Sequence, residues 1–169
     1  MKTTKKGFTL IELIVVIAII GVLAAILVPS MLGYVKKSKI QGANSAASTM
    51  LKAVNSALEE LDEEDKIFTG ASVGHTSADA SADDVIKYMK QYSDDVESVL
   101  WEARLNNGVA VACAVRSGRY YGTSPIVATN KTYDEKLGKC ADVSAAAGEA
   151  LAKWETDHDV SSSGGSSES

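Results

Sequence analysis

The fold of this chain is decided by residues 6–35, KGFTLIELIVVIAIIGVLAAILVPSMLGYV. Between Phe8 and Val35 the one charged side chain is Glu12, and the other residues show no polar stripe. At about 1.5 Å per residue, a helix over this range is about 42 Å long, which exceeds a hydrocarbon core of about 30 Å. A helix that is apolar all round is buried in lipid or inside an assembly. The segment is therefore expected to occupy one of these two environments.

Two general targeting segments share this apolarity. A secretory signal peptide has a shorter apolar core and a small-residue cleavage site after it, whereas this run continues past Ala25 to Val28. A plain membrane anchor fits the length. Neither alternative explains Glu12, because a carboxylate within hydrocarbon is costly and marks function by default. Lys2, Lys5 and Lys6 favour a cytoplasmic N-terminus, although lysines also follow the run.

The residues Lys6-Gly7-Phe8-Thr9-Leu10-Ile11-Glu12 resemble the signal of type IV prepilins and type II secretion pseudopilins. That signal has a short basic leader ending in Gly, followed by Phe-Thr-Leu-Ile-Glu at the start of a long apolar helix. The resemblance covers about residues 1–40. It implies that residues 1–7 are a leader, and that a membrane prepilin peptidase cuts between Gly7 and Phe8 and methylates the new amine of Phe8.

The resemblance also assigns roles within the apolar run. Cleavage creates a positive amine four residues before Glu12, and the two charges can pair between neighbouring subunits and reward correct register. Gly21 and Pro29 lie where family members carry helix-loosening residues. Pro29 removes one helical hydrogen bond, so we expect a bend or local unwinding there. This is either a kink tolerated in a membrane or a site that melts during assembly.

After Lys39 the sequence becomes amphipathic at helical spacing, and we expect the helix to continue to about Leu61. This predicts an α+β, type IV pilin-like lollipop: one very long N-terminal helix, packed by its second half against a small antiparallel β-sheet head. The expected parts are the leader 1–7, a transmembrane and assembly helix 8–35, an amphipathic continuation 36–62, a head 63–159, and a disordered Ser/Gly tail 160–169 that is native or an added extension.

The head sequence predicts short elements. Ser81 resembles a cap before a helix whose buried face we expect to include Val85, Tyr88, Met89 and Tyr92. Alternating residues predict strands over 99–105 and 109–115, joined by a hairpin at 106–108, with a third strand over 120–123. The buried positions expected in the first two strands are Val99, Trp101, Ala103, Leu105, Val109, Val111, Cys113 and Val115. Residues 143–154 are Ala-rich and favour a final helix.

Cys113 and Cys140 are the two cysteines. If the head leaves the cytoplasm, a disulfide between them is the expected outcome, and two buried reduced thiols are the alternative. In many pilins a similar pair delimits a surface loop, but here about thirty residues follow Cys140. Such a bond would contribute about 3–4 kcal/mol to stability.

Composition and motifs narrow the function classes. The net charge is −5, and loss of Lys2, Lys5 and Lys6 would change it to −8, which argues against binding to nucleic acid. His75 and His158 are isolated, and we find no catalytic, metal or cofactor motif. The acidic runs 62–65 and 79–84 lack the alternation of a calcium loop, so solvated charge is the preferred interpretation.

The sequence thus favours a structural subunit rather than an enzyme. Its expected partners are identical subunits in a helical filament, prepilin peptidase, a membrane assembly platform, and the lipid bilayer before assembly. The precursor would lie in the cytoplasmic membrane and the filament at the cell surface. A pseudopilin of a type II secretion or competence machine is the alternative, and the cysteine pair leans toward a pilus. A membrane-tethered binding or enzymatic domain is a third hypothesis from another class.

Overall fold

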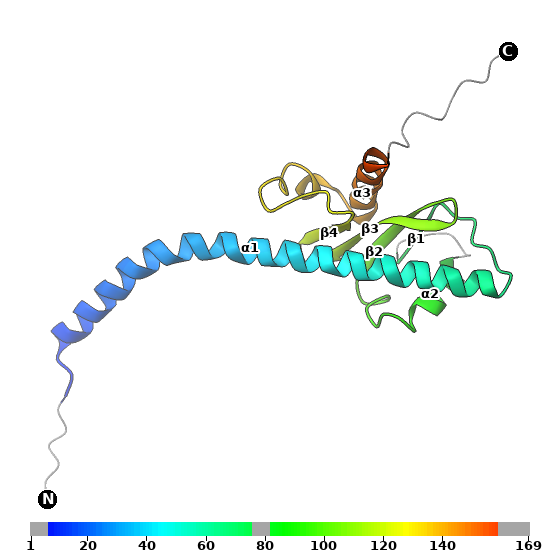
Figure 1. Ribbon diagram of the computed structural model, residues 1–169. Helices are drawn as coiled ribbons and strands as arrows, with labels where there is room; N and C mark the ends of the chain where they lie inside the picture. The colour runs from blue at the N-terminus through cyan, green and yellow to red at the C-terminus, as the bar shows by residue number, and fades with distance from the viewer. Residues whose placement is uncertain (1–6, 76–81, 159–169) are drawn as a thin grey trace, which may run out of the picture. The chain divides into compact units, whose positions relative to one another are not determined.

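The computed structural model describes residues 7–75 and 82–158. It divides into two compact units, residues 1–36 and 37–169. Most of the expected leader, the cap at Ser81 and the tail 160–169 lie outside the described residues. The elements are α1 (Leu10–Glu63), β1 (Ser72–Gly74), α2 (Ala82–Met89), β2 (Leu100–Asn106), β3 (Val109–Ser117), β4 (Tyr120–Ser124), the 3₁₀ helix η1 (Leu137–Lys139) and α3 (Val143–Asp157) (Figure 1).

Helix α1 confirms the expected long N-terminal helix and ends two residues beyond the predicted Leu61. In the second unit it buries one stripe at helical spacing, as its amphipathic pattern predicts. Four of the buried positions are alanines, whose small side chains allow the strands to approach the helix closely. The buried residues of α1 are Ile40, Ala43, Asn44, Ala47, Met50, Ala53, Val54, Ala57, Leu58 and Leu61.

The sheet has four antiparallel strands in the order β1-β2-β3-β4. Asn106 pairs with Val109, so the β2–β3 turn contains only Asn107 and Gly108. Both have positive φ, 52° and 79°, which Asn-Gly provides readily in a two-residue hairpin. This confirms the predicted turn. Strand β4 is also confirmed, whereas the three-residue β1 was not predicted because it is too short to show alternation.

A β-bulge in β3 corrects the predicted burial pattern. Arg104 pairs with Ala112 but the next residue, Leu105, pairs with Ala110, which leaves Val111 as the extra residue. Val109 is consequently exposed and Val111 is half-buried, although both were expected in the core. Ala110 is buried instead. The bulge shifts the alternation by one residue, so a simple period of two fails at this point.

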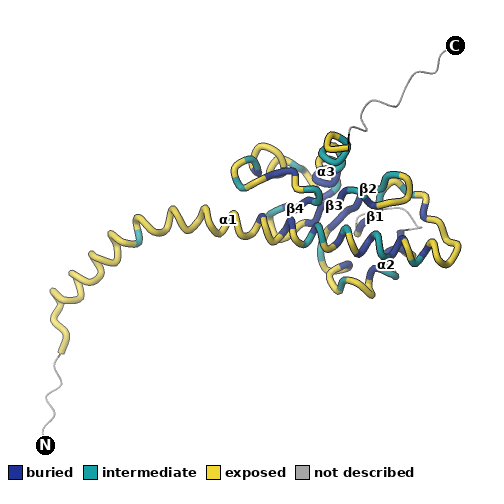
Figure 2. The backbone as a smooth tube through the Cα atoms, in the orientation of Figure 1, coloured by how far each residue is buried: buried dark blue, intermediate teal, exposed yellow. Residues whose placement is uncertain are grey.

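Both faces of the sheet are covered, whereas the sequence analysis placed only α1 on it. One core joins α1 to Trp101, Ala103, Cys113 and Val115, and Trp101 is fully buried with its Nε1 donating to Val96 O at 2.8 Å. The other core lies on the opposite face of the sheet, under α3 (Figures 1 and 2). Its strand residues alternate with those of the first core. The core under α3 contains Ile40, Ala112, Ala114, Tyr121, Val127, Ala128, Tyr133, Leu137, Val143, Ala146, Ala147 and Ala150.

The face under α3 also contains a buried ion pair. Arg104 Nη2 lies 2.9 Å from Glu102 Oε1 and donates to Ser144 Oγ at 3.0 Å. Ser144 Oγ in turn donates to Glu102 Oε1 at 3.1 Å. Glu102 is only 5% exposed, and these contacts compensate its burial, because a buried charge is tolerated when it is paired and hydrogen-bonded. The network joins β2 to the first turn of α3.

Helix α2 ends before the last residue of its predicted apolar face. Val85 and Met89 are buried as expected, but Tyr88 is half-buried and Tyr92 is 46% exposed. The helix ends at Met89, so Tyr92 does not follow the helical repeat. Its hydroxyl donates instead to the carboxylate of Glu60 on α1. Tyr92 is therefore a polar link to α1 and not a core residue.

Gly122 in β4 marks the closest approach of the sheet to α1. A Cβ at this position would lie 1.9 Å from the carbonyl carbon of Ala43 and 2.3 Å from Asn44 N. Both are backbone atoms, which cannot move aside as a flexible side chain could. The small side chains of α1 and the absent side chain of Gly122 together set the distance between helix and sheet.

We predict that Gly122→Ala destabilises the chain by about 3 kcal/mol or more, because the added methyl group forces α1 away from the sheet. Gly148→Ala is the matched control: its Cβ would meet nothing within 4 Å, and alanine favours helix α3 by about 0.5–1 kcal/mol. Urea unfolding of the detergent-solubilised chain, followed by tryptophan fluorescence, measures both changes. Equal stabilities for the two variants would contradict the close approach.

Candidate functional site

The predicted cleavage point lies in non-helical backbone. Gly7, Phe8 and Thr9 precede helix α1, which begins at Leu10. Phe8 is 85% exposed, and Gly7 has no neighbour near the position of a Cβ. A protease must bind its substrate in an extended form, and this bond needs no unwinding of a helix to reach it. The geometry is compatible with the predicted cut between Gly7 and Phe8.

Thr9 and Glu12 form a capping box at the start of α1. Thr9 N and Thr9 Oγ1 donate to Glu12 Oε2 at 2.8 and 2.6 Å, and Glu12 N donates to Thr9 Oγ1 at 3.4 Å. Such an exchange satisfies backbone donors that the first helical turn leaves free. The Thr-x-x-Glu spacing is a sequence signal for this motif, and the sequence analysis overlooked it because Glu12 was interpreted only as an assembly charge.

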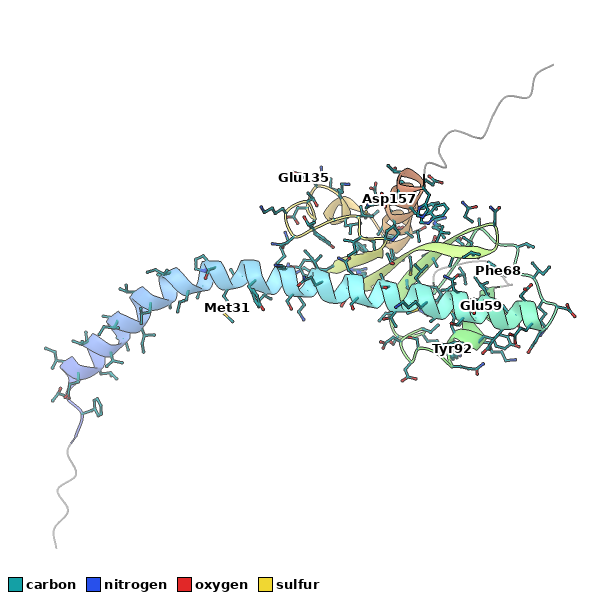
Figure 3. The ribbon with its side chains drawn as sticks, viewed as in Figure 1. Met31, Glu59, Phe68, Tyr92, Glu135 and Asp157 are labelled. Atoms are coloured by element: carbon teal, nitrogen blue, oxygen red, sulfur yellow. The ribbon has the colours of Figure 1, made fainter. Side chains whose placement is uncertain are left out.

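The apolar surface of the first unit is uncovered. Every large apolar side chain that the structure describes from Phe8 to Val35 is at least 43% exposed. Figure 2 shows this part of α1 as almost entirely exposed, and in Figure 3 its side chains, Met31 among them, point outward from the helix. Among the described residues, α1 is the one helix long and apolar enough to cross a membrane, by length and composition alone. This surface is a far larger apolar patch than a soluble monomer leaves in water.

Helix α1 is continuous through Gly21 and Pro29. Of the two outcomes expected at Pro29, local unwinding does not occur in this structure. The Ser30 hydroxyl donates to Leu27 O at 2.9 Å, whereas the carbonyl that loses its helical donor through Pro29 is that of Ala25. Melting at this point on assembly remains a prediction.

Two asparagines of α1 attach it to the sheet. Asn55 Nδ2 donates to Ala110 O at 3.0 Å, and Ala110 N donates to Asn55 Oδ1 at 2.9 Å. Asn44 Oδ1 accepts from Thr123 N at 2.9 Å. These contacts were not predicted, because a pattern of apolar residues does not reveal which amides bind strand backbones.

The predicted disulfide is not formed. Cys113 and Cys140 are free thiols, with Cys113 in the core shared with α1 and Cys140 against the core under α3. The two side chains therefore lie on opposite faces of the sheet. Sulfur atoms must approach to about 2 Å to bond, and a sheet between them prevents this. Burial raises the pKa of both thiols, and Cys113 has no exposed surface.

The described part of the head holds no group of three or more His, Cys, Asp or Glu side chains that could bind a metal ion. His158 Nδ1 lies 2.8 Å from Trp154 O and its ring stacks on Trp154, and His75 is exposed elsewhere. In the acidic run at the end of α1, Glu64 pairs with Lys66 at 2.9 Å. The run 79–84 lies partly outside the described residues.

Comparison with known proteins identifies the N-terminal segment. Residues 2–28 match the family model of the prokaryotic N-terminal methylation motif. The chain is 41% identical over 70 residues to type IV major fimbrial protein FimA of Dichelobacter nodosus, covering 41% of this chain and 44% of that protein. It is 42% identical over 82 residues to the type IV major alpha-pilin of Moraxella bovis, covering 46% and 51%.

A longer match is to type IV major pilin protein PilE1 of Neisseria gonorrhoeae, with 32% identity over 118 residues, 70% of this chain and 62% of that protein. The chain thus spans about half the length of the curated relatives that it matches. No solved structure matches the chain. The matched motif begins before Gly7 and includes both Thr9 and Glu12.

We predict that Thr9→Ala exposes the first amides of α1 to exchange, because it removes the hydroxyl that pairs with Glu12. Loss of a cap costs about 1 kcal/mol, which corresponds to about fivefold faster hydrogen exchange at the amides of Glu12 and Leu13. Mass spectrometry of the chain in detergent micelles measures the rate. Thr9→Ser, which keeps the hydroxyl, should exchange like the parent chain. If the two variants behave alike, the capping box does not stabilise the helix.

We also predict that a maleimide applied without reductant labels Cys140 in the folded chain, and labels both cysteines in guanidinium chloride. Cys113 is protected by full burial in the core and by its raised pKa. Peptide mapping by mass spectrometry assigns the labels. If neither cysteine reacted in the denaturant until a reductant was added, the two would be bonded after all.

Proposed function

We propose that this chain belongs to the type IV pilin family and is a major pilin: a structural subunit of an extracellular filament. The observation that carries the proposal is the exposed apolar helix of residues 8–35, behind a motif that matches the N-terminal methylation model. An apolar surface of this extent needs lipid or other protein around it. The names of FimA, PilE1 and the alpha-pilin support the same role.

The same helix would serve two environments in turn. Before assembly, residues 8–35 cross the cytoplasmic membrane, with the lysine-containing leader inside and the head outside. Prepilin peptidase removes residues 1–7, and a membrane assembly platform transfers the subunit to the filament. There the apolar helices of identical subunits cover one another in place of lipid. The head of residues 37–158 then forms the outer surface.

Glu12 is the residue that would set the register between subunits. Among the residues that the structure describes, its carboxylate accepts hydrogen bonds from Thr9 of the same helix turn. Cleavage at Gly7 creates a positive amine on Phe8, and a neighbouring subunit can present that amine to Glu12. A charge enclosed by apolar helices is costly unless it is paired, so misaligned subunits would be rejected.

The alternative functions have weaker support. The cysteine pair favoured a pilus over a secretion or competence pseudopilin, and that argument fails because the disulfide is not formed. The preference for a pilus over a pseudopilin now depends on the relatives, which are named as major pilins and fimbrial proteins. Those relatives are structural proteins, which also favours a subunit over a tethered enzyme. The absence of enzymatic activity is part of this proposal.

The first test is the intact mass and N-terminal sequence of the protein purified from its native cell surface. We expect a chain that begins at N-methylated Phe8, carries two unmodified thiols and is recovered in sheared filaments. A chain that starts at Met1, or one cut after Ala25, would overturn the prepilin assignment. Monomeric surface material with the correct N-terminus would favour the tethered domain.

A second test separates membrane storage from assembly. Glu12→Gln keeps the shape of the side chain and removes its charge, so we expect a normal membrane level of processed subunit and at least about a tenfold loss of sheared filaments. Lys52→Gln, a change of one exposed charge on the head, is the control and should assemble normally. Normal filament yield from Glu12→Gln would show that the charge does not guide assembly.

A further inference from the structure

A groove of about 500 Å³ lies on the head at the beginning of the second unit. One wall comes from α1 and the other from the segment that follows β4. A pocket of this volume is in the range that small ligands occupy. Its lining residues are Lys37, Ile40, Gln41 and Asn44 of α1, and Ile126, Ala128, Thr129, Asn130 and Lys131.

The groove combines an apolar floor with a cationic rim. Ile40 and Ala128 are buried, and Ile126 stands 56% exposed at its edge. Lys37 and Lys131 are exposed, and no acidic side chain lines the groove. This combination suits a ligand that has a negative group next to an aliphatic chain. It does not suit a wholly polar ligand or a wholly apolar one.

Asn130 adds an unused acceptor to the groove. Among the described residues, its buried Oδ1 has no hydrogen-bond partner, which is unusual for a polar atom removed from water. Because water does not reach this atom, a hydroxyl or ammonium donor of a ligand would satisfy it once the Asn130 side chain turned toward the groove. The groove therefore has three kinds of contact to offer: positive charge, apolar surface and one hydrogen-bond acceptor.

One residue of the groove, Lys37, lies next to the apolar run in the sequence, and this indicates where such a ligand would come from. Lys37 follows Val35, the last residue of the apolar run, by two residues. When residues 8–35 span a bilayer, Lys37 is at the level of the lipid head groups, because one residue of helix advances by about 1.5 Å. Lysines next to a membrane attract anionic lipids, and basic pockets there bind their head groups.

We propose that the groove binds an anionic glycerophospholipid of the storage membrane. Lys37 and Lys131 contact the phosphate, and an acyl chain lies on Ile40 and Ile126. The Asn130 side chain, turned toward the groove, accepts a hydrogen bond from the hydroxyl or ammonium of the head group. The inference rests on the proposed membrane span of residues 8–35. Bound lipid would hold the head close to the bilayer until assembly removes the subunit from it.

The test uses the full chain reconstituted in vesicles of phosphatidylcholine, with and without a photoreactive phosphatidylglycerol. After illumination, peptide mass spectrometry locates the labelled residues. We expect label on residues 37–44 and 126–131, and a decrease of about fivefold or more in the double variant Lys37→Gln/Lys131→Gln. Ile126→Ser should also reduce the label, whereas Ile67→Ser, an exposed isoleucine outside the groove, should not.

The matched control is Lys39→Gln/Lys52→Gln, which removes the same charge from exposed α1 residues that do not line the groove. An equal decrease in this control would show general attraction to the membrane and overturn the proposal. Label that fell outside residues 37–44 and 126–131 would also overturn it. Failure to insert into either vesicle would refute the membrane span itself, which is a separate result.

Discussion

The fold of the head depends on the contact between the second half of α1 and the sheet. The four buried alanines of the helix, together with Gly122 on β4, allow backbone to approach backbone. Trp101 and Met50 then fill the space beside this contact. Because the contact is backbone to backbone in places, larger side chains cannot be accommodated by rotamer changes alone. The small residues are thus as important to this core as the large ones.

One helix carries two different kinds of surface, and this division explains the function that we propose. Its first half is apolar on every side, and its large apolar side chains are exposed within the part of the chain that the structure describes. Its second half is amphipathic and buries its apolar face within the head. A subunit built in this way folds its head independently of its neighbours, and leaves one element to lipid or to other subunits. Glu12 is the one charge inside that element, and in the isolated chain it has a local partner in Thr9.

The sequence predicted the long helix, the hairpin and the last helix, since each has a strong local signal: extended apolarity, an Asn-Gly turn and an alanine-rich repeat. It did not predict the bulge at Val111 or the three-residue β1. Each involves too few residues to be recognised in the alternation of apolar and polar residues. Tyr92 was misplaced because the repeat of α2 was extended beyond its end. The disulfide was inferred from the expected compartment, and compartment carries no information on which face of a sheet a side chain occupies.

In the candidate site, Glu12, Gly7 and Phe8 were identified from the sequence because they belong to a motif with fixed spacing. The groove beside Lys37 was not, since residues 126–131 reach α1 only through the fold of β4 and the segment after it. Asn44 and Asn55 were missed for a similar reason. Their partners are backbone atoms of strands far away in the sequence, and no spacing along the chain encodes such a contact.

These two asparagines have a mechanical consequence. Asn55 forms hydrogen bonds with both the N–H and the C=O of Ala110, and Asn44 accepts one from the N–H of Thr123. Helix α1 is therefore attached to β3 and to β4 at two positions along its axis. A pull along the helix that moved it by one turn, about 5.4 Å, would break all three bonds at once and bring the alanine stripe out of register with Gly122. The helix cannot slide in small steps, because each intermediate position loses the same contacts. Tension applied to residues 8–35 would therefore act on β3 and β4 together, through these three hydrogen bonds.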